Sequence, residues 1–293
     1  MQRGVPLAGY ASLNAASDNE EFNYFGVHGN TDKTPQVRLG SKGSVAGEPA
    51  RRFSSPATTA VWAPENTREA IFDGIKMKET YGTSGTFIRL RFFGGWNYKK
   101  DLTKNKIFVK KAYADGVPMG GDLKNKPAKA RAPTFAVWAL KDPESGNLDR
   151  IQIVKGWFER GYAFEKVYDV VWADADKRKV GADGKAPPVG NTVNIKKASY
   201  TNDIGDTQLS AVWTDPDFNP SNHAVYYVRV LEIPTPRWTT YDAMALGIDP
   251  PADVAATIQE RAWSSPIWYT PTEELERKLK KPTHYYGLQP FIP

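Results

Sequence analysis

The chain has 293 residues, so it can bury a sizeable hydrophobic core in one large domain or two moderate ones. It contains no cysteine, which excludes disulfides, thiol nucleophiles and cysteine-ligated metal sites, and no apolar run of about 18 residues predicts a membrane span. The 39 basic and 33 acidic residues leave a net charge of +6 on a mixed surface, from which we expect no nucleic-acid partner.

The first 60 residues are rich in Gly, Ser, Asn and Pro and show little hydrophobic periodicity. A segment of this kind orders only by packing against another part of a protein. A helix follows, because Asn66 is a good N-cap and Glu69 completes a capping box, which predicts a helix over about residues 66–81. Gly82 and Gly85 supply the backbone freedom for a turn, so we expect the helical layer to end at about residue 85.

The start of this helix is a candidate site for an anion. Free backbone N–H groups and the helix dipole favour negative charge there, and Glu65, Asn66 and Arg68 lie beside them. The Arg68 guanidinium can pair with a phosphate or a carboxylate in bidentate fashion. The alternative is that Asn66 only caps the helix and that Arg68 is solvated.

From residue 86 to residue 240 the side chains follow the two-residue period of strands, and turn residues separate these runs. No helix is predicted in this region. The segment Ala224–Glu232 is apolar on both faces, which predicts a central strand. Turn residues gather at 141–147, 174–190 and 215–222, at intervals suited to an antiparallel sandwich.

The last part, residues 241–293, is predicted to be a tail with short helices. Pro250 and Pro251 indicate a helix over residues 252–261, and a charged segment indicates another over 273–281. Arg261 and Trp263 form an arginine–aromatic pair that either stacks a planar ligand or holds the tail on the sandwich.

The sequence predicts no catalytic residue and no metal ligand. The three histidines, His28, His223 and His284, are far apart, and no pair has the spacing of metal ligands. The segment Gly82–Gly85 is not the nucleophile elbow of a serine hydrolase, and no phosphate-binding loop is present.

Long, aromatic-rich motifs of this chain resemble a known family. They lie in the family's order at Val61–Trp96, Gly116–Leu123, Leu148–Trp157, Ala211–Pro220, Tyr226–Ala243 and Gln259–Pro271. The chain resembles, from about Phe22 to Pro271, the bacterial family catalogued as domain of unknown function 3604. The amino-terminal part of that family is similar to the metal-dependent hydrolases of the polymerase and histidinol phosphatase superfamily, whose ligands lie in His-x-His and Asp-x-His motifs. Neither motif occurs here.

The resemblance implies that the chain is the carboxy-terminal half of a phosphoesterase-like hydrolase and is not catalytically complete. Its expected fold is mainly β with a minor α part. Residues 1–85 would be a remnant of an α/β hydrolase-like layer, residues 86–240 an antiparallel β-sandwich, and residues 241–293 a helical wrapping tail. No cofactor is expected in this chain, and a divalent metal is expected only in a full-length relative. Whether the chain is an enzyme stays open.

Partners and location follow from the same resemblance. We expect a small-molecule or anionic ester ligand, together with the missing amino-terminal half or a second copy of the chain. The location is periplasmic if the full-length form carries an export signal, and cytoplasmic as the sequence is written. The residues expected to face a substrate are His28, Trp62, Glu65, Asn66, Arg68, Arg261 and Trp263.

A binding module is the alternative function. In this hypothesis exposed Trp and Tyr side chains of the sandwich hold a glycan or a cell-envelope polymer by stacking. A row of exposed aromatic residues on one face of a sheet would favour it.

Overall fold

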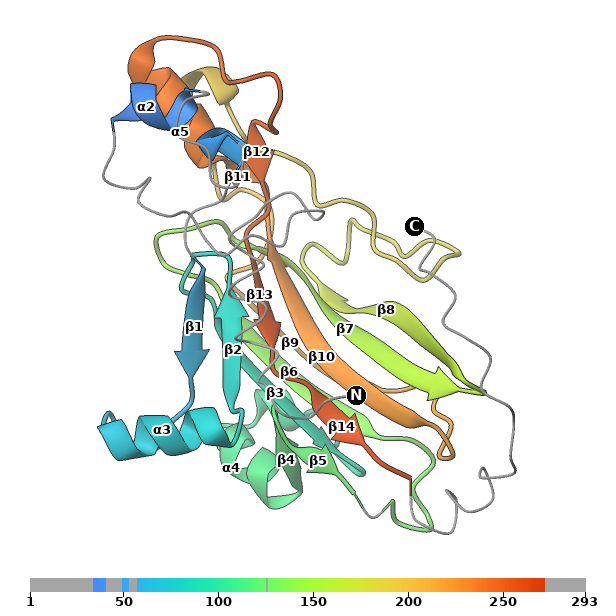
Figure 1. Ribbon diagram of the computed structural model, residues 1–293. Helices are drawn as coiled ribbons and strands as arrows, with labels where there is room; N and C mark the ends of the chain where they lie inside the picture. The colour runs from blue at the N-terminus through green and yellow to red at the C-terminus, as the bar shows by residue number, and fades with distance from the viewer. Residues whose placement is uncertain (1–33, 41–48, 53–56, 125, 272–293) are drawn as a thin grey trace.

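The computed structural model describes residues 34–40, 49–52, 57–124 and 126–271 (Figure 1). The described chain is mainly β with a minor α part, as the sequence predicts. An eight-stranded sheet and a four-stranded sheet, in which all but one of the strand pairs are antiparallel, pack on each other like a sandwich.

The large sheet is built around strand β10 (His223–Glu232), whose position as a central strand confirms the prediction for this segment. One edge of β10 pairs with β7 (Leu148–Glu159), which pairs with β8 (Tyr162–Trp172). Its other edge pairs with two short strands in succession, β13 (Arg261–Ser264) and β14 (Ile267–Tyr269). Strands β2 (Thr80–Thr83) and β1 (Thr58–Val61) extend the sheet beyond β13, and β5 (Asp122–Leu123) pairs in parallel with β14.

The small sheet has the order β4-β3-β6-β9. Its strands are β3 (Arg89–Gly95), β4 (Gly116–Pro118), β6 (Thr134–Leu140) and β9 (Gln208–Thr214). The core lies between the two sheets, because alternate apolar side chains of both point inward. Phe135 of β6 lies at its centre, with its ring centroid 5.6 Å from that of Phe92 and 4.4 Å from that of Tyr226.

Helix α3 spans Arg68–Lys76 and corrects the prediction for residues 66–81. Its N-cap is Thr67, whose Oγ1 accepts a hydrogen bond from the Ala70 N–H at 3.3 Å, and not Asn66. The helix ends early because the next segment pairs as a strand of the large sheet. Gly82 therefore lies inside β2 opposite Trp263 and is no turn, although Gly85 has a φ of 130° in the bend that follows.

A helix interrupts the strands between residues 86 and 240, which the sequence analysis did not predict. Helix α4 (Phe108–Ala114) follows the 3-10 turn η2 (Leu102–Lys104) and packs through Phe108 and Ala112 on Phe93 of the small sheet. A second short 3-10 turn, η3, spans Ile195–Lys197.

The predicted helix over residues 252–261 is also wrong. This segment contains strand β12 (Thr257–Ile258), which pairs with β11 (Thr235–Pro236), and the first residue of β13. The helix of this region is α5 (Trp238–Leu246), which ends at Gly247 with a φ of 68°. The predicted helix over 273–281 lies outside the described residues.

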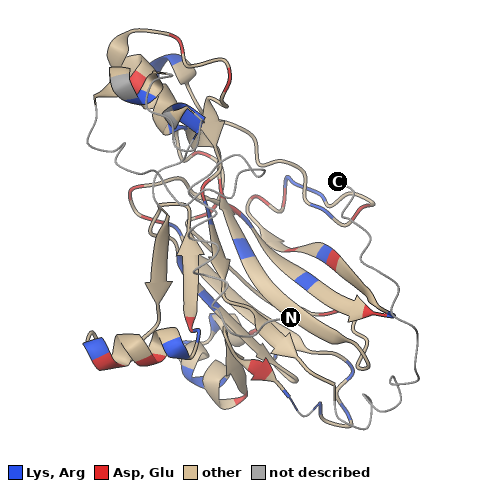
Figure 2. Ribbon diagram, viewed as in Figure 1, with Lys and Arg blue, Asp and Glu red and all other residues tan. Residues whose placement is uncertain are grey.

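Helix α5 packs beside α2 (Pro35–Leu39) and the 3-10 turn η1 (Ala50–Arg52), above the sheets in the view of Figure 1. The Arg38 guanidinium and the Asp242 carboxylate hold α2 on α5 with a contact of 2.6 Å. An ion pair of 2.8 Å between Arg51 and Asp253 likewise connects η1 to the loop that follows α5. Lys, Arg, Asp and Glu are spread over the described elements (Figure 2), and none of the described helices is long and apolar enough to cross a membrane.

Candidate functional site

The hairpin of β7 and β8 carries a row of aromatic residues on one face. Trp157 lies opposite Phe164, and Glu159 lies opposite Tyr162, so these four side chains leave the hairpin on the same side. We call Trp157, Tyr162 and Phe164 the aromatic face. Further along the same side, β7 and β8 face the small sheet, so the aromatic face continues the inner surface of the large sheet.

The aromatic face is open to solvent at the tip of the hairpin. The exposed fraction is 62% for Tyr162 and 45% for Phe164, whereas Trp157 is partly buried. The rings of Trp157 and Phe164 stack at a centroid distance of 5.4 Å and an interplanar angle of 18°. Two aromatic planes are therefore fixed next to a third, exposed ring.

Charged side chains border the aromatic face. Lys166 Nζ and the Tyr168 hydroxyl both bind Asp217 Oδ2, at 2.6 Å each. These hydrogen bonds from Lys166 and Tyr168 lower the pKa of the Asp217 carboxyl, which therefore stays ionised. The rim thus presents one cation and one anion in a fixed pair.

A buried ion pair lies directly behind this rim. Lys155 Nζ contacts Asp215 Oδ2 at 2.7 Å, and the Tyr226 hydroxyl donates to the same oxygen at 2.7 Å. Both charged side chains are almost fully buried, and Lys155 also donates to the Asp217 carbonyl at 2.7 Å. Because burial desolvates its phenolate, the pKa of Tyr226 is raised well above its ordinary value, so this hydroxyl remains a donor.

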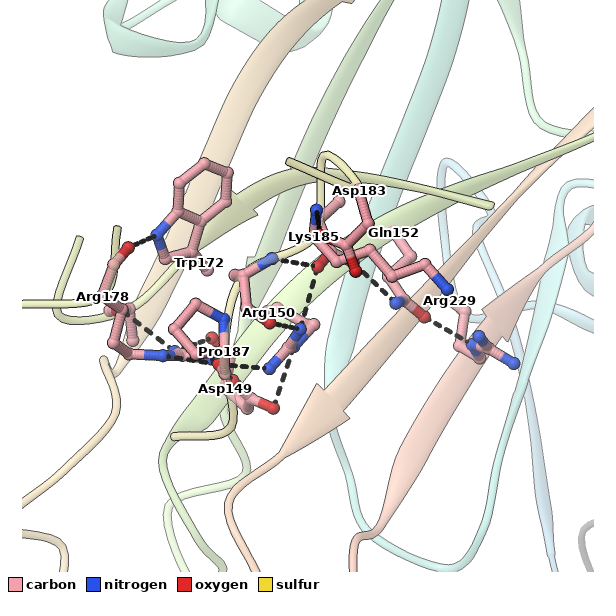
Figure 3. Close-up of polar contacts among 12 residues, drawn as sticks. Asp149, Arg150, Gln152, Trp172, Arg178, Asp183, Lys185, Pro187 and Arg229 are labelled. Atoms are coloured by element: carbon pink, nitrogen blue, oxygen red, sulfur yellow. Dashed lines mark hydrogen bonds and ion pairs between the residues drawn. The ribbon is translucent and has the colours of Figure 1, made fainter. Parts of the chain in front are cut away.

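The other end of the hairpin is held by the polar network in Figure 3. Arg150 of β7 binds Asp149 at 3.0 Å and Asp169 of β8 at 2.8 Å. Arg178 in the loop after β8 binds Asp149 at 2.6 Å, and it also donates to the Pro187 carbonyl at 2.6 Å. The network fixes the loop on the sheet and braces the base of the hairpin, so we assign it a structural role.

Carboxyl groups gather at the sandwich end opposite the hairpin tip. Glu232 is fully buried, and its Oε2 accepts a hydrogen bond from Ser145 at 2.5 Å. Burial is the main cause that raises the pKa of this carboxyl to about 8, and the negative charges of Glu260 and Asp142 add to it. Glu260 itself accepts a hydrogen bond from Ser84. Among the described residues, no group of three His, Asp or Glu side chains has the arrangement of a metal site.

The residues predicted to face a substrate lie in three environments. Trp62 is engaged within the fold, since its Nε1 donates to the Leu90 carbonyl at 2.8 Å and Arg91 lies 3.3 Å from its ring centroid. Arg261 and Trp263 are brought together, at 5.9 Å from the guanidinium carbon to the ring centroid.

Those of the remaining predicted residues that the structure describes do not join this pair. Glu65, Asn66 and Arg68 are exposed before and at the start of α3, where Glu65 accepts a hydrogen bond from Thr67 at 3.2 Å. His28 lies outside the described residues. Contact of any of these residues with a substrate stays a prediction.

The aromatic face was missed by the sequence analysis, although the sequence carries a signal for it. Arg160 and Gly161 have φ angles of 50° and 90°, as in a tight hairpin turn. Aromatic residues flank this turn on both sides in the string WFERGYAF. A turn pair between aromatic strand residues predicts a hairpin whose tip displays Trp157, Tyr162 and Phe164 on one side and Phe158 on the other.

Comparison with known proteins identifies the family. A family model described as protein of unknown function (DUF3604) matches residues 7–271, which is most of the chain. No curated protein and no solved structure shows significant similarity to it. The motifs from Val61 to Pro271 therefore identify the chain correctly, and it belongs to the family of proteins of unknown function DUF3604.

Proposed function

We propose that this chain is a binding module that holds a glycan of the cell envelope on the aromatic face of the β7–β8 hairpin. The observation that carries the proposal is the exposure of Tyr162 and Phe164 on one side of the hairpin, next to the stacked Trp157. It is the row of exposed aromatic residues that favours a binding module over the alternatives.

Sugar rings have apolar faces of C–H groups and polar edges of hydroxyls. Fixed aromatic planes bind the faces, and neighbouring charged groups bind the edges. The pair of Lys166 and Asp217 beside the aromatic face offers a donor and an acceptor for hydroxyls. Because Trp157 and Phe164 are stacked and Lys166 is paired with Asp217 before a ligand arrives, these groups lose little conformational entropy on binding.

Titration of the purified chain with chitohexaose and with solubilised peptidoglycan fragments tests the proposal, with tryptophan fluorescence and calorimetry as readouts. Tyr162→Ala and Phe164→Ala should each weaken binding by roughly ten-fold, since a lost stacking contact costs about 1–2 kcal/mol. Phe87→Ala is the matched control, because Phe87 is also exposed, at 67%, but precedes β3 at the opposite end of the sandwich. Equal affinities in the wild type and both hairpin variants would refute the proposal.

A second proposal concerns a longer form of the protein. There the chain would be the carboxy-terminal portion of a metal-dependent, phosphoesterase-like hydrolase, in which bound metal activates water against an ester. The support is the resemblance of the family's amino-terminal part to metal-dependent hydrolases. The present chain would then supply substrate-facing groups such as Arg261 and Trp263, and no catalytic residue.

Activity assays on the chain and on a form extended at its amino terminus test this second proposal. We expect chelator-sensitive hydrolysis of bis(p-nitrophenyl) phosphate, with metal retained, only in the extended form. Chelator-sensitive turnover by the present chain would contradict it.

A further inference from the structure

Helix α3 presents two of its large apolar side chains to solvent. The exposed fraction is 61% for Phe72 and 46% for Ile75. The buried residue of the helix is Gly74, where an added Cβ would lie 2.7 Å from Val61 Cγ2 and 2.8 Å from the Trp62 carbonyl oxygen. Successive residues of an α-helix are separated by about 100°, so Phe72 and Gly74 point to nearly opposite sides. The helix thus packs on β1 through Gly74, with Ala70 and Ile71 partly buried, and turns an apolar stripe of Phe72 and Ile75 outward.

Charges of opposite sign flank this apolar stripe. Glu69 precedes Phe72 by three residues and Lys76 follows it by four, so all three lie on one side of the helix. Figure 2 shows both signs of charge along α3. An acidic first turn and a basic last turn match the helix dipole, and they also make the stripe complementary to its own antiparallel copy.

The spacing of the charges fits a two-fold axis. If two copies of α3 lie antiparallel about a point between Phe72 and Asp73, Glu69 and Lys76 are each about 3.5 residues from that point, or about 5 Å along the helix. Glu69 of one copy then lies level with Lys76 of the other. Because a two-fold axis acts twice, two such ion pairs form, one on each side of the apolar centre.

We propose that α3 is a homodimer contact, in which a second copy of the chain binds antiparallel across a two-fold axis. Phe72 lies next to its counterpart at the centre. Ile75 lies between the centre and the end of the helix and faces Phe72 and Ala70 of the second copy, and each Glu69 pairs with Lys76 of the second copy. Because α3 has only nine residues, the contact is small, and the expected dissociation constant lies in the range of micromolar to millimolar.

Sedimentation velocity over a concentration series up to about 1 mM tests the contact. The wild type should shift from monomer to dimer with concentration, and Phe72→Glu should remain monomeric. Phe87→Glu is the control, since it places the same charge at an exposed aromatic position outside α3 and should dimerise like the wild type. Circular dichroism verifies that each variant is folded.

A charge-reversal cycle tests the antiparallel geometry. Glu69→Lys and Lys76→Glu should each weaken the dimer by roughly ten-fold, because each reversal replaces two attractive contacts by two repulsive ones. The double variant with both reversals should recover most of the wild-type affinity. A wild type that stays monomeric at every concentration, a dimer unaffected by Phe72→Glu, or a double variant without recovery would each overturn the proposal. Those results would assign the stripe to another partner or another geometry.

Discussion

Replacing Glu232 by Gln should change how the stability of the protein depends on pH. The Glu232 carboxyl is fully buried at the end of β10, where Ser145 is its hydrogen-bond donor at 2.5 Å. Its pKa rises from 4.5 to about 8 in the folded protein, chiefly because burial disfavours the charged form. The folded state therefore binds the proton more tightly than the unfolded state does.

The sign and the size of the effect follow from linkage. Below pH 4.5 the carboxyl is protonated in both states, and its full contribution to stability is present. As the pH rises towards 8, the unfolded chain loses the proton first, so the wild type should lose about 1.4 kcal/mol of unfolding free energy per pH unit. Glu232→Gln keeps a neutral side chain of the same size and should not show this loss. The unfolding free energy of Glu232→Gln, relative to that of the wild type, should therefore increase by at most about 4 kcal/mol between pH 5 and pH 8.

Urea unfolding at pH 5, 6, 7 and 8, followed by tryptophan fluorescence, measures this difference. Other groups with raised pKa values, such as Glu79 and Asp206, occur in both proteins and cancel in the comparison. Glu144→Gln is the control variant, because Glu144 is exposed on the same loop as Ser145. Parallel curves for the wild type and Glu232→Gln would refute the reasoning, since Glu232 would then be ionised in the folded protein at neutral pH.

Four further substitutions have definite expected outcomes in the same urea assay. Asp215→Asn should destabilise the protein by about 3–5 kcal/mol, because Lys155 is left as a buried charge without its carboxylate; an unchanged midpoint would contradict that role. Gly74→Ala should destabilise by about 1–3 kcal/mol despite the better helix propensity of alanine, since its Cβ has no room against β1, and a stabilised variant would show that α3 can move outward. Thr67→Ala should cost about 1 kcal/mol and Asn66→Ala almost nothing, whereas the opposite order would restore Asn66 as the helix cap.

The strands of the core could be predicted because they are short apolar runs, rich in β-branched and aromatic residues, that are bounded by turns. Val228 and Val230 of β10 are buried as their spacing indicates, and so are Phe135 and Val137 of β6. The period of two is a strong signal when one face is in the core and the other is partly exposed.

Helix boundaries could not be predicted in the same way. The helical pattern after Asn66 continues beyond Lys76 in the sequence. In the structure, however, Thr80–Thr83 pairs with β13, a distant part of the chain, and forms a strand of the sheet. Helix α5 was missed for two reasons. It is packed between other elements and therefore has no polar stripe, and its buried residues Thr239 and Thr240 have weak helix propensity.

The candidate site was harder to predict than the fold. Trp157 and Phe164 are residue types that are common in protein cores. Their face is open because the tip of the hairpin extends beyond the small sheet, which the sequence does not reveal. Arg261 and Trp263 could be paired from their spacing, because alternate residues of a strand lie on one face. The burial of Glu232 could not be predicted from the sequence. It depends on the loops that contain Ser145, Thr86 and Glu260, which lie elsewhere in the chain.

Strand β13 lies between β2 and β10, and this position determines the order in which the strands of the large sheet can pair. Among the described strands, residues 261–264 join residues 80–83 to residues 223–232 in one sheet, and they are made last of these segments. On a ribosome, the hairpin of β7 and β8 and the small sheet can form while β1 and β2 still wait for their neighbour. Closure of the large sheet therefore depends on contacts of very long sequence separation, so we expect it late in folding, and one edge of β10 stays unpaired until residues 261–269 have been made.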